Sequence, residues 1–280
     1  MLGLGCLGCC ENASTSLLTF VLGVWITTRF LDSAAATGHS RAAVCGQLFV
    51  LAICSLFAIL LLSSDTRSFM FSRLCSALSR NTLLDSRRCA HLAAAHGRVL
   101  ELGPGTGVNF RCFSGQQFTP NITELHLVEP NRFFQVELEA NIARSALAFP
   151  VTIHYDGIES FGLPRHDYDE SFDVIYGTHV LCSVRSISLA LKAIARLLKR
   201  HGKYLVFEHV LGKTDQWFLR LLQVLFQPLF YIVGAGCTFR DLSISLRLIL
   251  PDYETRLEHW QAPMPIPLLK PHTIGSFTKP

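Results

Sequence analysis

The sequence predicts an α/β fold built on a largely parallel sheet, and three observations lead to it. Short apolar runs alternate with helical segments from Arg98 onward, which is typical of parallel strands joined by helices. The first of these runs flows directly into a turn that contains three glycines, as at the ligand-binding edge of many α/β sheets. The residues before this region are strongly apolar, so we expect an N-terminal membrane-anchoring helical region ahead of the sheet.

The N-terminal region contains two apolar segments. Residues 43–62 carry no charged side chain, and a helix needs roughly 20 residues to cross the hydrocarbon core of a bilayer. A buried core helix is the alternative, but core helices seldom stay apolar on every face for this length. A second apolar segment covers residues 16–31, and whether residues 13–31 cross the bilayer stays open. We expect a membrane-embedded hairpin and divide the chain into an anchor, residues 1–66, and a domain that contains the sheet, residues 67–280.

Charge indicates on which side of the membrane the domain lies. The link between the two apolar segments holds only Arg29 and Arg41. Five arginines follow the segment 43–62: Arg67, Arg73, Arg80, Arg87 and Arg88. The positive-inside rule therefore places the domain in the cytosol. These arginines are expected to face anionic lipid head groups or solvent. The net charge is only +4 and no basic run is interleaved with aromatic residues, so a nucleic-acid partner is not expected.

The expected elements of the domain follow one another in a regular order. The expected strands are 98–102, 124–128, 151–155, 171–176 and 203–208. A first helix is expected to begin at residue 108, and two further helices to cover 131–146 and 186–198. Residues 253–260 and 273–278 are expected to form an antiparallel edge hairpin. Lys199-Arg200-His201-Gly202 is expected to end the last of these helices. No internal repeat interrupts this order.

The ten cysteines show no paired Cys-x-x-Cys units, so no metal site is predicted from their spacing. Five of them are scattered through the domain: Cys75, Cys89, Cys112, Cys182 and Cys237. A reducing compartment would keep these five as thiols, which is the state that we expect.

The glycine turn is the first part of a candidate ligand site. Its residues are Glu101, Gly103, Gly105, Thr106 and Gly107, at the end of the first strand. Glycines adopt positive φ readily and let a ligand approach the backbone closely. The spacing is Gly-x-Gly-x-Gly, and valine stands at the next position, where a dinucleotide-binding fingerprint has its third glycine.

Carboxylates after the next two strands extend this site. Glu129 ends the second strand, where an acidic side chain accepts hydrogen bonds from both hydroxyls of a ribose. Asp156-Gly157-Ile158 follows the third strand, where a carboxylate is placed to accept a hydrogen bond from an adenine amino group and backbone N–H groups meet a ring nitrogen. Glu159 is the alternative carboxylate.

Two histidines follow the fourth and fifth strands, whose carboxyl ends meet at the same edge of a sheet. Thr178 and His179 follow the fourth strand, where Thr178 is a candidate ligand contact and His179 is expected to touch the ligand or to act as a base. His209 ends the fifth strand beside Glu208, which is expected to orient the ring. His209, with His179 as the reserve candidate, is expected to accept a proton from a thiol or hydroxyl. Structural hydrogen-bonding roles are the alternative for both.

The quoted motifs resemble those of membrane-associated class I S-adenosylmethionine-dependent methyltransferases of the thiol S-methyltransferase-like (methyltransferase-like 7) family. The matching segments are residues 100–110, 128–131, 180–184, 207–210 and 236–240, within a resemblance that extends from Phe71 to Lys279. It implies a Rossmann-like sheet, S-adenosyl-L-methionine as cofactor, and an N-terminal anchor on the endoplasmic reticulum or lipid droplets. Animal members methylate small thiols. The two-segment N-terminus and His179, at a position often apolar in relatives, depart from the family pattern.

The function that we expect is methyl transfer to a small or lipophilic acceptor at a membrane. A nucleotide-dependent oxidoreductase and a catalytically inactive membrane scaffold of the same fold are the alternatives. One apolar stretch, Trp217–Val233, has three competing interpretations: core packing, an interfacial helix, or a lid over an apolar substrate. Pro228 is expected to break it. The sequence leaves the oligomeric state open.

Overall fold

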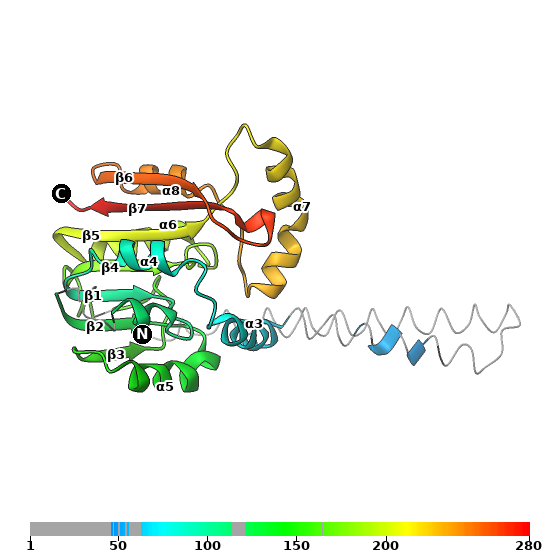
Figure 1. Ribbon diagram of the computed structural model, residues 1–280, viewed down its shortest axis with the longest axis horizontal. Helices are drawn as coiled ribbons and strands as arrows, with labels where there is room; N and C mark the ends of the chain where they lie inside the picture. The colour runs from blue at the N-terminus through cyan, green and yellow to red at the C-terminus, as the bar shows by residue number, and fades with distance from the viewer. Residues whose placement is uncertain are drawn as a thin grey trace, which may run out of the picture. The chain divides into compact units, whose positions relative to one another are not determined.

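The computed structural model describes residues 46, 48–49, 51–53, 55, 63–113, 121–163 and 165–280 (Figure 1). The chain divides into two compact units, Met1–Leu62 and Ser63–Pro280. Residues 16–31 and most of residues 43–62 lie outside the described residues. In the described parts of the chain, no helix is both long enough and apolar enough to cross a membrane. The membrane anchor and its hairpin therefore stay predictions.

The unit Ser63–Pro280 contains one sheet, with seven strands among its described residues in the order β3-β2-β1-β4-β5-β7-β6. The strands are β1 Gly97–Leu102, β2 Ile122–Val128, β3 Val151–His154, β4 Phe172–Thr178, β5 Leu198–His209, β6 Glu254–Gln261 and β7 Pro271–Thr278. The strands β1 to β5 pair in parallel, and β7 pairs antiparallel with both β5 and β6. The expected parallel sheet with an antiparallel edge hairpin is confirmed.

Helices cover both faces of this sheet (Figure 1). They are α3 Ser64–Leu78, α4 Asp85–Leu92, η1 Val108–Cys112, η2 Arg132–Phe134, α5 Gln135–Ser145, α6 Ile187–Leu197, α7 Trp217–Val233, α8 Leu242–Ile249 and η3 Pro267–Leu269. Successive side chains of a strand point to opposite faces. In β1, Val99 accordingly packs in one core cluster with residues of α4, η1 and α5, and Leu100 in the other with residues of α6 and α8.

One predicted boundary is wrong. The sequence predicts that Lys199–Gly202 ends a helix, but β5 begins earlier, at Leu198. Leu198 pairs with Phe172 of β4, and the Lys199 Nζ lies 2.8 and 2.9 Å from the two carboxylate oxygens of Asp173. These contacts hold residues 198–202 on the sheet as part of β5. The local sequence pattern, by itself, is typical of the end of a helix.

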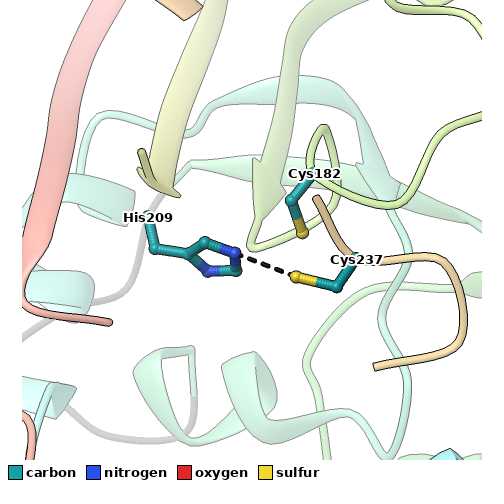
Figure 2. Close-up of side chains that lie close together, drawn as sticks. All are labelled: Cys182, His209 and Cys237. Carbon is teal, nitrogen blue, oxygen red and sulfur yellow. Dashed lines mark hydrogen bonds between the residues drawn. The ribbon is translucent and has the colours of Figure 1, made fainter. Parts of the chain in front are cut away.

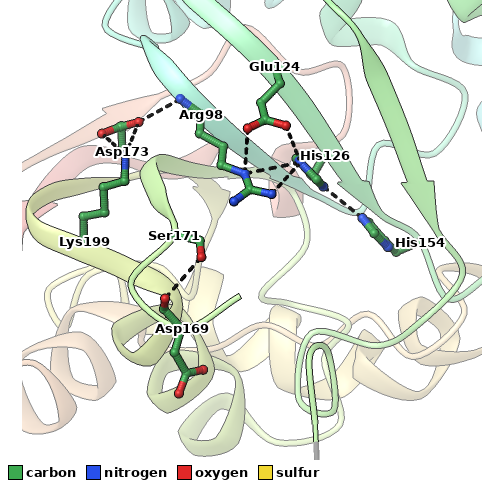
Figure 3. Close-up of polar contacts among 8 residues, drawn as sticks. All are labelled: Arg98, Glu124, His126, His154, Asp169, Ser171, Asp173 and Lys199. Carbon is green, nitrogen blue, oxygen red and sulfur yellow. Dashed lines mark hydrogen bonds and ion pairs between the residues drawn. The ribbon is translucent and has the colours of Figure 1, made fainter. Parts of the chain in front are cut away.

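A polar network occupies the amino ends of β1, β2 and β4, the edge of the sheet opposite the glycine turn (Figure 3). Asp173 accepts a hydrogen bond of 2.8 Å from the backbone N–H of Arg98, and the Arg98 guanidinium pairs with Glu124 at 2.9 Å. His126 lies 3.0 Å from His154. The network joins neighbouring strands and reaches His154 at the carboxyl end of β3, whose carbonyl accepts a hydrogen bond of 2.9 Å from the backbone N–H of Glu129. We interpret it as structural.

Two further expectations are wrong. Cys89 and Cys112 were expected as thiols but form a disulfide, which joins α4 to η1. Arg88 was expected to face lipid or solvent, but it is only 6% exposed and its guanidinium pairs with Asp85. The spacing of the cysteines does not reveal the disulfide, because α4 has to fold against η1 to create it. The Arg88–Asp85 pair lies within α4, where the two residues are three positions apart.

Candidate active site

The glycine turn follows β1 at the carboxyl edge of the sheet, and all three of its glycines have positive φ: +56° at Gly103, +56° at Gly105 and +80° at Gly107. A Cβ atom at Gly103 would lie 2.8 Å from Val180, and one at Gly107 would lie 2.3 Å from Phe110. These two glycines are therefore required by packing within the protein.

Gly105 differs from its two neighbours, because a Cβ atom there would meet only the ring of Phe134, at 3.7 Å. The space beside its backbone is thus not filled by the described protein atoms. Thr106, the next residue, is buried, and its carbonyl accepts a hydrogen bond of 2.5 Å from Asn141 of α5. The turn is therefore held by α5 through Asn141, and the space beside the backbone of Gly105 is open.

Glu129 lies beside the open part of the turn. Its Oε2 accepts a hydrogen bond of 3.0 Å from the backbone N–H of Gly105, and its Oε1 accepts one of 2.8 Å from the backbone N–H of Asn131. The residue is only 4% exposed, and burial raises the pKa of its carboxyl group to about 7. Each carboxylate oxygen keeps capacity for a further hydrogen bond.

Glu101 is completely buried beneath the turn. Its two oxygens accept hydrogen bonds of 2.7 Å from the Asn109 amide and 2.7 Å from the Tyr176 hydroxyl. Burial raises the pKa of Glu101 to about 7 as well. The Asn109 amide also lies 3.3 Å from the Thr178 hydroxyl, so it connects two predicted site residues. Sequence reasoning missed Asn109, although it comes directly after the glycine motif.

The residues after β3 divide between the core and the surface. Asp156 is exposed at the edge of the sheet, whereas Ile158 is buried in the core cluster that contains Leu100. Glu159, the alternative carboxylate, accepts a hydrogen bond of 2.9 Å from the backbone N–H of Arg185 and thereby holds the segment before α6. Asp156 is thus the carboxylate exposed at this edge, and Gly157 lies beside it.

Helix α3 lies against the same edge of the sheet. The Ser68 carbonyl accepts a hydrogen bond of 2.9 Å from Asn131, and Phe71 contacts the ring of Phe134 edge-on. Burial raises the pKa of the Cys75 thiol to about 12, and the nearby Glu129 contributes to this rise. Sequence reasoning assigned no element here, because α3 has no strong apolar stripe to reveal it.

The two predicted proton acceptors lie after β4 and β5. The Nε2 atom of His179 lies 2.9 Å from the Nε2 atom of His272, and burial holds the pKa of His179 well below its usual range. His209 is buried, and its Nε2 atom lies 3.1 Å from the Cys237 sulfur.

Glu208 does not orient His209 as expected, because successive strand residues point to opposite faces. The Glu208 carboxylate instead accepts hydrogen bonds of 2.7 and 2.8 Å from the backbone N–H groups of Val180 and Leu181. His209 has two thiols near it, those of Cys182 and Cys237 (Figure 2). The sequence predicts both cysteines as thiols but does not connect them with His209, since they are far from it in the chain.

Helix α7 also departs from the sequence expectations. It runs without interruption through Pro228, and Gln223 is its only buried residue. Its exposed apolar side chains are Trp217, Phe218, Leu221, Val224, Leu225, Phe226, Leu229, Tyr231 and Val233. The core-packing interpretation of this stretch is therefore wrong.

Comparisons with known proteins identify the family. A methyltransferase domain model matches residues 66–276. The chain is 30% identical over 182 residues to human thiol S-methyltransferase TMT1A, covering 65% of this chain and 70% of that one. It is 31% identical over 196 residues to human thiol S-methyltransferase TMT1B, covering 67% and 74% of the two chains.

A solved structure supports the fold. An S-adenosylmethionine-dependent methyltransferase from Thermotoga maritima superposes with a TM-score of 0.51 at 19% sequence identity, covering 76% of this chain and 100% of that one. This similarity confirms the expected Rossmann-like fold. The family match and the two human relatives confirm the expected enzyme class and, with it, S-adenosylmethionine as the cofactor. The chain belongs to the class I S-adenosylmethionine-dependent methyltransferases, in the family of the thiol S-methyltransferases TMT1A and TMT1B.

Proposed function

We propose that this protein transfers the methyl group of S-adenosyl-L-methionine to a small or lipophilic thiol at a membrane surface. The observation that carries the proposal is the pairing of Glu129 with Gly105, which places a buried carboxylate beside an open backbone turn. The relatives TMT1A and TMT1B are thiol S-methyltransferases, and this similarity supports a thiol as the acceptor.

The residues of the carboxyl edge fit the cofactor. Gly105 leaves room for a ligand against the backbone, Glu129 is placed to accept hydrogen bonds from ribose hydroxyls, and Asp156 is exposed to meet an adenine amino group. We propose that Glu101 acts at the turn through Asn109. When bound, the sulfonium of S-adenosylmethionine supplies an electrophilic methyl group and leaves as a neutral thioether. The protein's task is therefore mainly to align donor and acceptor and to exclude water.

A thiol acceptor has to lose its proton, since the thiolate is the nucleophile. The groups nearest to the carboxyl ends of β4 and β5 are Thr178, His179 and His209. The Nε2 atom of each histidine already contacts another side chain. This favours a role for the two rings in positioning other groups, rather than as proton acceptors for the thiol. The proposal therefore does not depend on a single histidine base.

Apolar surface supports a membrane location. The exposed side chains of α7 include Trp217, Leu221 and Leu225, and α3 adds Phe69 and Leu78. The two helices contact one another within the unit, and the ring of Tyr231 receives the Arg67 guanidinium at 5.3 Å. Exposed apolar side chains gathered on two neighbouring helices indicate a membrane or protein contact. We propose that it rests on lipid, on the cytosolic side of the endoplasmic reticulum or of lipid droplets.

The alternatives are less well supported. Family membership and Val108, in place of a glycine, give an oxidoreductase no support. An inactive scaffold would have no need for the buried carboxylate at the open turn, because burying it is costly.

The test uses the full chain in detergent, with the methyl group of the cofactor labelled. We expect labelled methyl thioethers from a panel of small and lipophilic thiols, and no product from the matching alcohols. S-adenosylhomocysteine should form in equal amount. Cofactor binding without a methyl thioether from any thiol of the panel would refute the proposed acceptor class.

A further inference from the structure

Three side chains of types that bind metals converge from three separate segments of the chain (Figure 2). Cys182 follows β4, His209 ends β5, and Cys237 lies between α7 and α8. Their ligand atoms, two thiol sulfurs and an imidazole nitrogen, all lie within 4.8 Å of one another, and all three residues are buried. Both cysteines are free thiols, and the Cys237 sulfur lies 3.1 Å from the His209 Nε2 atom.

The backbones that carry the two cysteines are tied to each other. The Cys182 carbonyl accepts hydrogen bonds of 3.0 Å from the Thr238 backbone N–H and 2.9 Å from the Thr238 hydroxyl. The Arg240 guanidinium donates to the Leu181 carbonyl at 3.1 Å and to the Val184 carbonyl at 2.8 Å. The segments around Cys182 and Cys237 are therefore held as one assembly.

Two polar side chains, the buried Glu208 and the partly buried Gln227, hold this assembly from outside. The Glu208 carboxylate accepts hydrogen bonds from the turn that leads to Cys182, at 2.7 and 2.8 Å. Gln227 of α7 donates to the Cys237 carbonyl at 3.1 Å and accepts from the Phe239 backbone N–H at 2.9 Å. Support of this kind is what a metal site needs, because ligands must be fixed before the ion binds.

We infer that Cys182, His209 and Cys237 form a binding site for one Zn²⁺ ion. Two thiolates and one imidazole are a donor set that zinc prefers, and the two thiolate charges balance the charge of the ion. Zn–S bonds of about 2.3 Å and Zn–N bonds of about 2.0 Å place tetrahedral ligand atoms roughly 3.5–3.8 Å apart. In the observed cluster the His209 nitrogen and the Cys237 sulfur are 3.1 Å apart and all ligand atoms lie within 4.8 Å of one another, a spacing that brackets these values.

Three protein ligands leave the fourth position of a tetrahedral zinc open, as in catalytic rather than structural sites. The cluster lies after β4 and β5, at the edge where open α/β sheets bind ligands. The next step rests on the proposed function: the open position of the zinc takes the sulfur of the acceptor thiol. The thiol releases its proton to solvent when it coordinates, and the methyl group then passes from the sulfonium sulfur to the acceptor sulfur, leaving S-adenosylhomocysteine.

The first test measures metal and needs neither cofactor nor acceptor. The full chain is purified with a reductant, and its metal content is determined by mass spectrometry. We expect one zinc per chain, and replacement by Co²⁺ should produce a thiolate-to-cobalt charge-transfer band. Cys182→Ser, Cys237→Ser and His209→Gln should each lower metal affinity by more than about tenfold. Cys75→Ser, which removes the third free cysteine among the described residues, should change neither the stoichiometry nor the band.

Two results would overturn the site. One is a wild-type chain that binds no zinc and gives no cobalt band after stripping and reloading. The other is a Cys182–Cys237 disulfide in the native chain, found by peptide mapping without reductant. Because both are measured on wild-type protein, a variant that fails to fold does not obscure them.

A second test separates the site from the proposed function. Addition of an acceptor thiol to the Co²⁺-loaded chain should shift the charge-transfer band, whereas the matching alcohol should not. If the chelator-stripped chain methylates thiols at the full rate, zinc has no part in the reaction and the inferred coordination fails, while the proposed function stands. If zinc binds and the thiol shifts the band but no thioether forms, the proposed function fails instead.

Discussion

The carboxylate of Glu129 accepts a hydrogen bond of 3.0 Å from the backbone N–H of Gly105, so the end of β2 is joined to the middle of the glycine turn. The contact keeps a nearly buried charge-bearing group beside the one turn glycine whose Cβ position is open. In the proposed ribose-binding site, the hydrogen-bond acceptor and the space beside the backbone are thus both present without the cofactor.

Glu129→Ala should weaken cofactor binding by about 1–3 kcal/mol, the range for hydrogen bonds to a charged group. The affinity is measured by calorimetry on the folded variant. Glu124→Gln provides the control, since Glu124 lies on the same strand but at its opposite end, paired with Arg98. An unchanged affinity in Glu129→Ala, with the fold intact, would remove Glu129 from the cofactor site.

Cofactor affinity should also rise with pH through the neutral range. Burial raises the pKa of Glu129 to about 7, from an ordinary value of 4.5, and ribose hydroxyls donate to the ionised form. Binding therefore improves as the carboxyl group loses its proton and levels off above about pH 7. The Glu129→Gln variant should lack this part of the pH dependence, whereas the contribution of Glu101, with a similar pKa, remains. Equal pH profiles for the two proteins would contradict the assignment.

The raised pKa of Glu129 has the opposite effect on the stability of the protein without cofactor: affinity rises with pH, whereas stability falls. The folded state holds the proton of Glu129 more tightly than the unfolded state does, so the free energy of unfolding should fall as pH rises from 4.5 to about 7. Thermal melts of Glu129→Gln should show a smaller fall over this interval.

Gly105→Val should abolish cofactor binding, because the branched side chain would fill the space beside the turn. Valine at a φ of +56° is also strained, at a cost of roughly 1–2 kcal/mol. Gly162→Val is the matched control, since Gly162 has a φ of +77° and only ordinary contacts around its Cβ position, but lies outside the turn. Both variants should lose stability, and only Gly105→Val should lose the cofactor. Normal methyl transfer by Gly105→Val would refute the motif assignment.

The parts of the site that lie close together in sequence were predictable, and the parts that depend on distant segments were not. The glycine turn and Glu129 could be read from the sequence because a strand, its turn and the end of the next strand have fixed relations in α/β sheets. The alternation of apolar runs and helical segments also predicted a parallel sheet with an antiparallel edge hairpin, but not the order of the strands in the sheet.

The cysteine contacts could not be predicted in this way. Cys182 and Cys237 meet only because Thr238 and Arg240 bind the turn after β4. Cys89 and Cys112 meet only once α4 packs against η1. The role of Glu208 was also misjudged, since adjacency in a strand places side chains on opposite faces.

Charges on α7 should weaken membrane binding. The test uses a truncated chain that begins at Ser63, which lacks the expected anchor but keeps α3 and α7. In α7, Val224 and Leu225 are 65% and 67% exposed. Val224→Glu with Leu225→Glu should lower vesicle partitioning by at least about tenfold, because burying one such side chain contributes about 1.5–3 kcal/mol. Leu189→Glu, at an exposed apolar position of α6, should have little effect. Equal sedimentation of both variants with vesicles would exclude α7 as the lipid contact.

The side of the membrane on which the domain lies is tested by a site that the chain already carries. Asn121-Ile122-Thr123 is an N-glycosylation acceptor sequence, and Asn121 is exposed. The arginines after the apolar segments favour the cytosol, where this asparagine would stay unmodified. The Cys89–Cys112 disulfide points the other way, because such bonds persist mainly in oxidising compartments.

We expect the full chain, expressed in cells, to show no glycan at Asn121 and to have Cys89 and Cys112 reactive toward a thiol reagent before lysis. In that case the disulfide forms only after the protein leaves its reducing compartment. A mass shift that a glycosidase removes and that Asn121→Gln abolishes would instead place the domain in the lumen. Protection of both cysteines should accompany that result, since the oxidising lumen would maintain their bond. The arginine argument would then be wrong, and the acceptor would have to be a thiol that reaches the lumenal membrane surface.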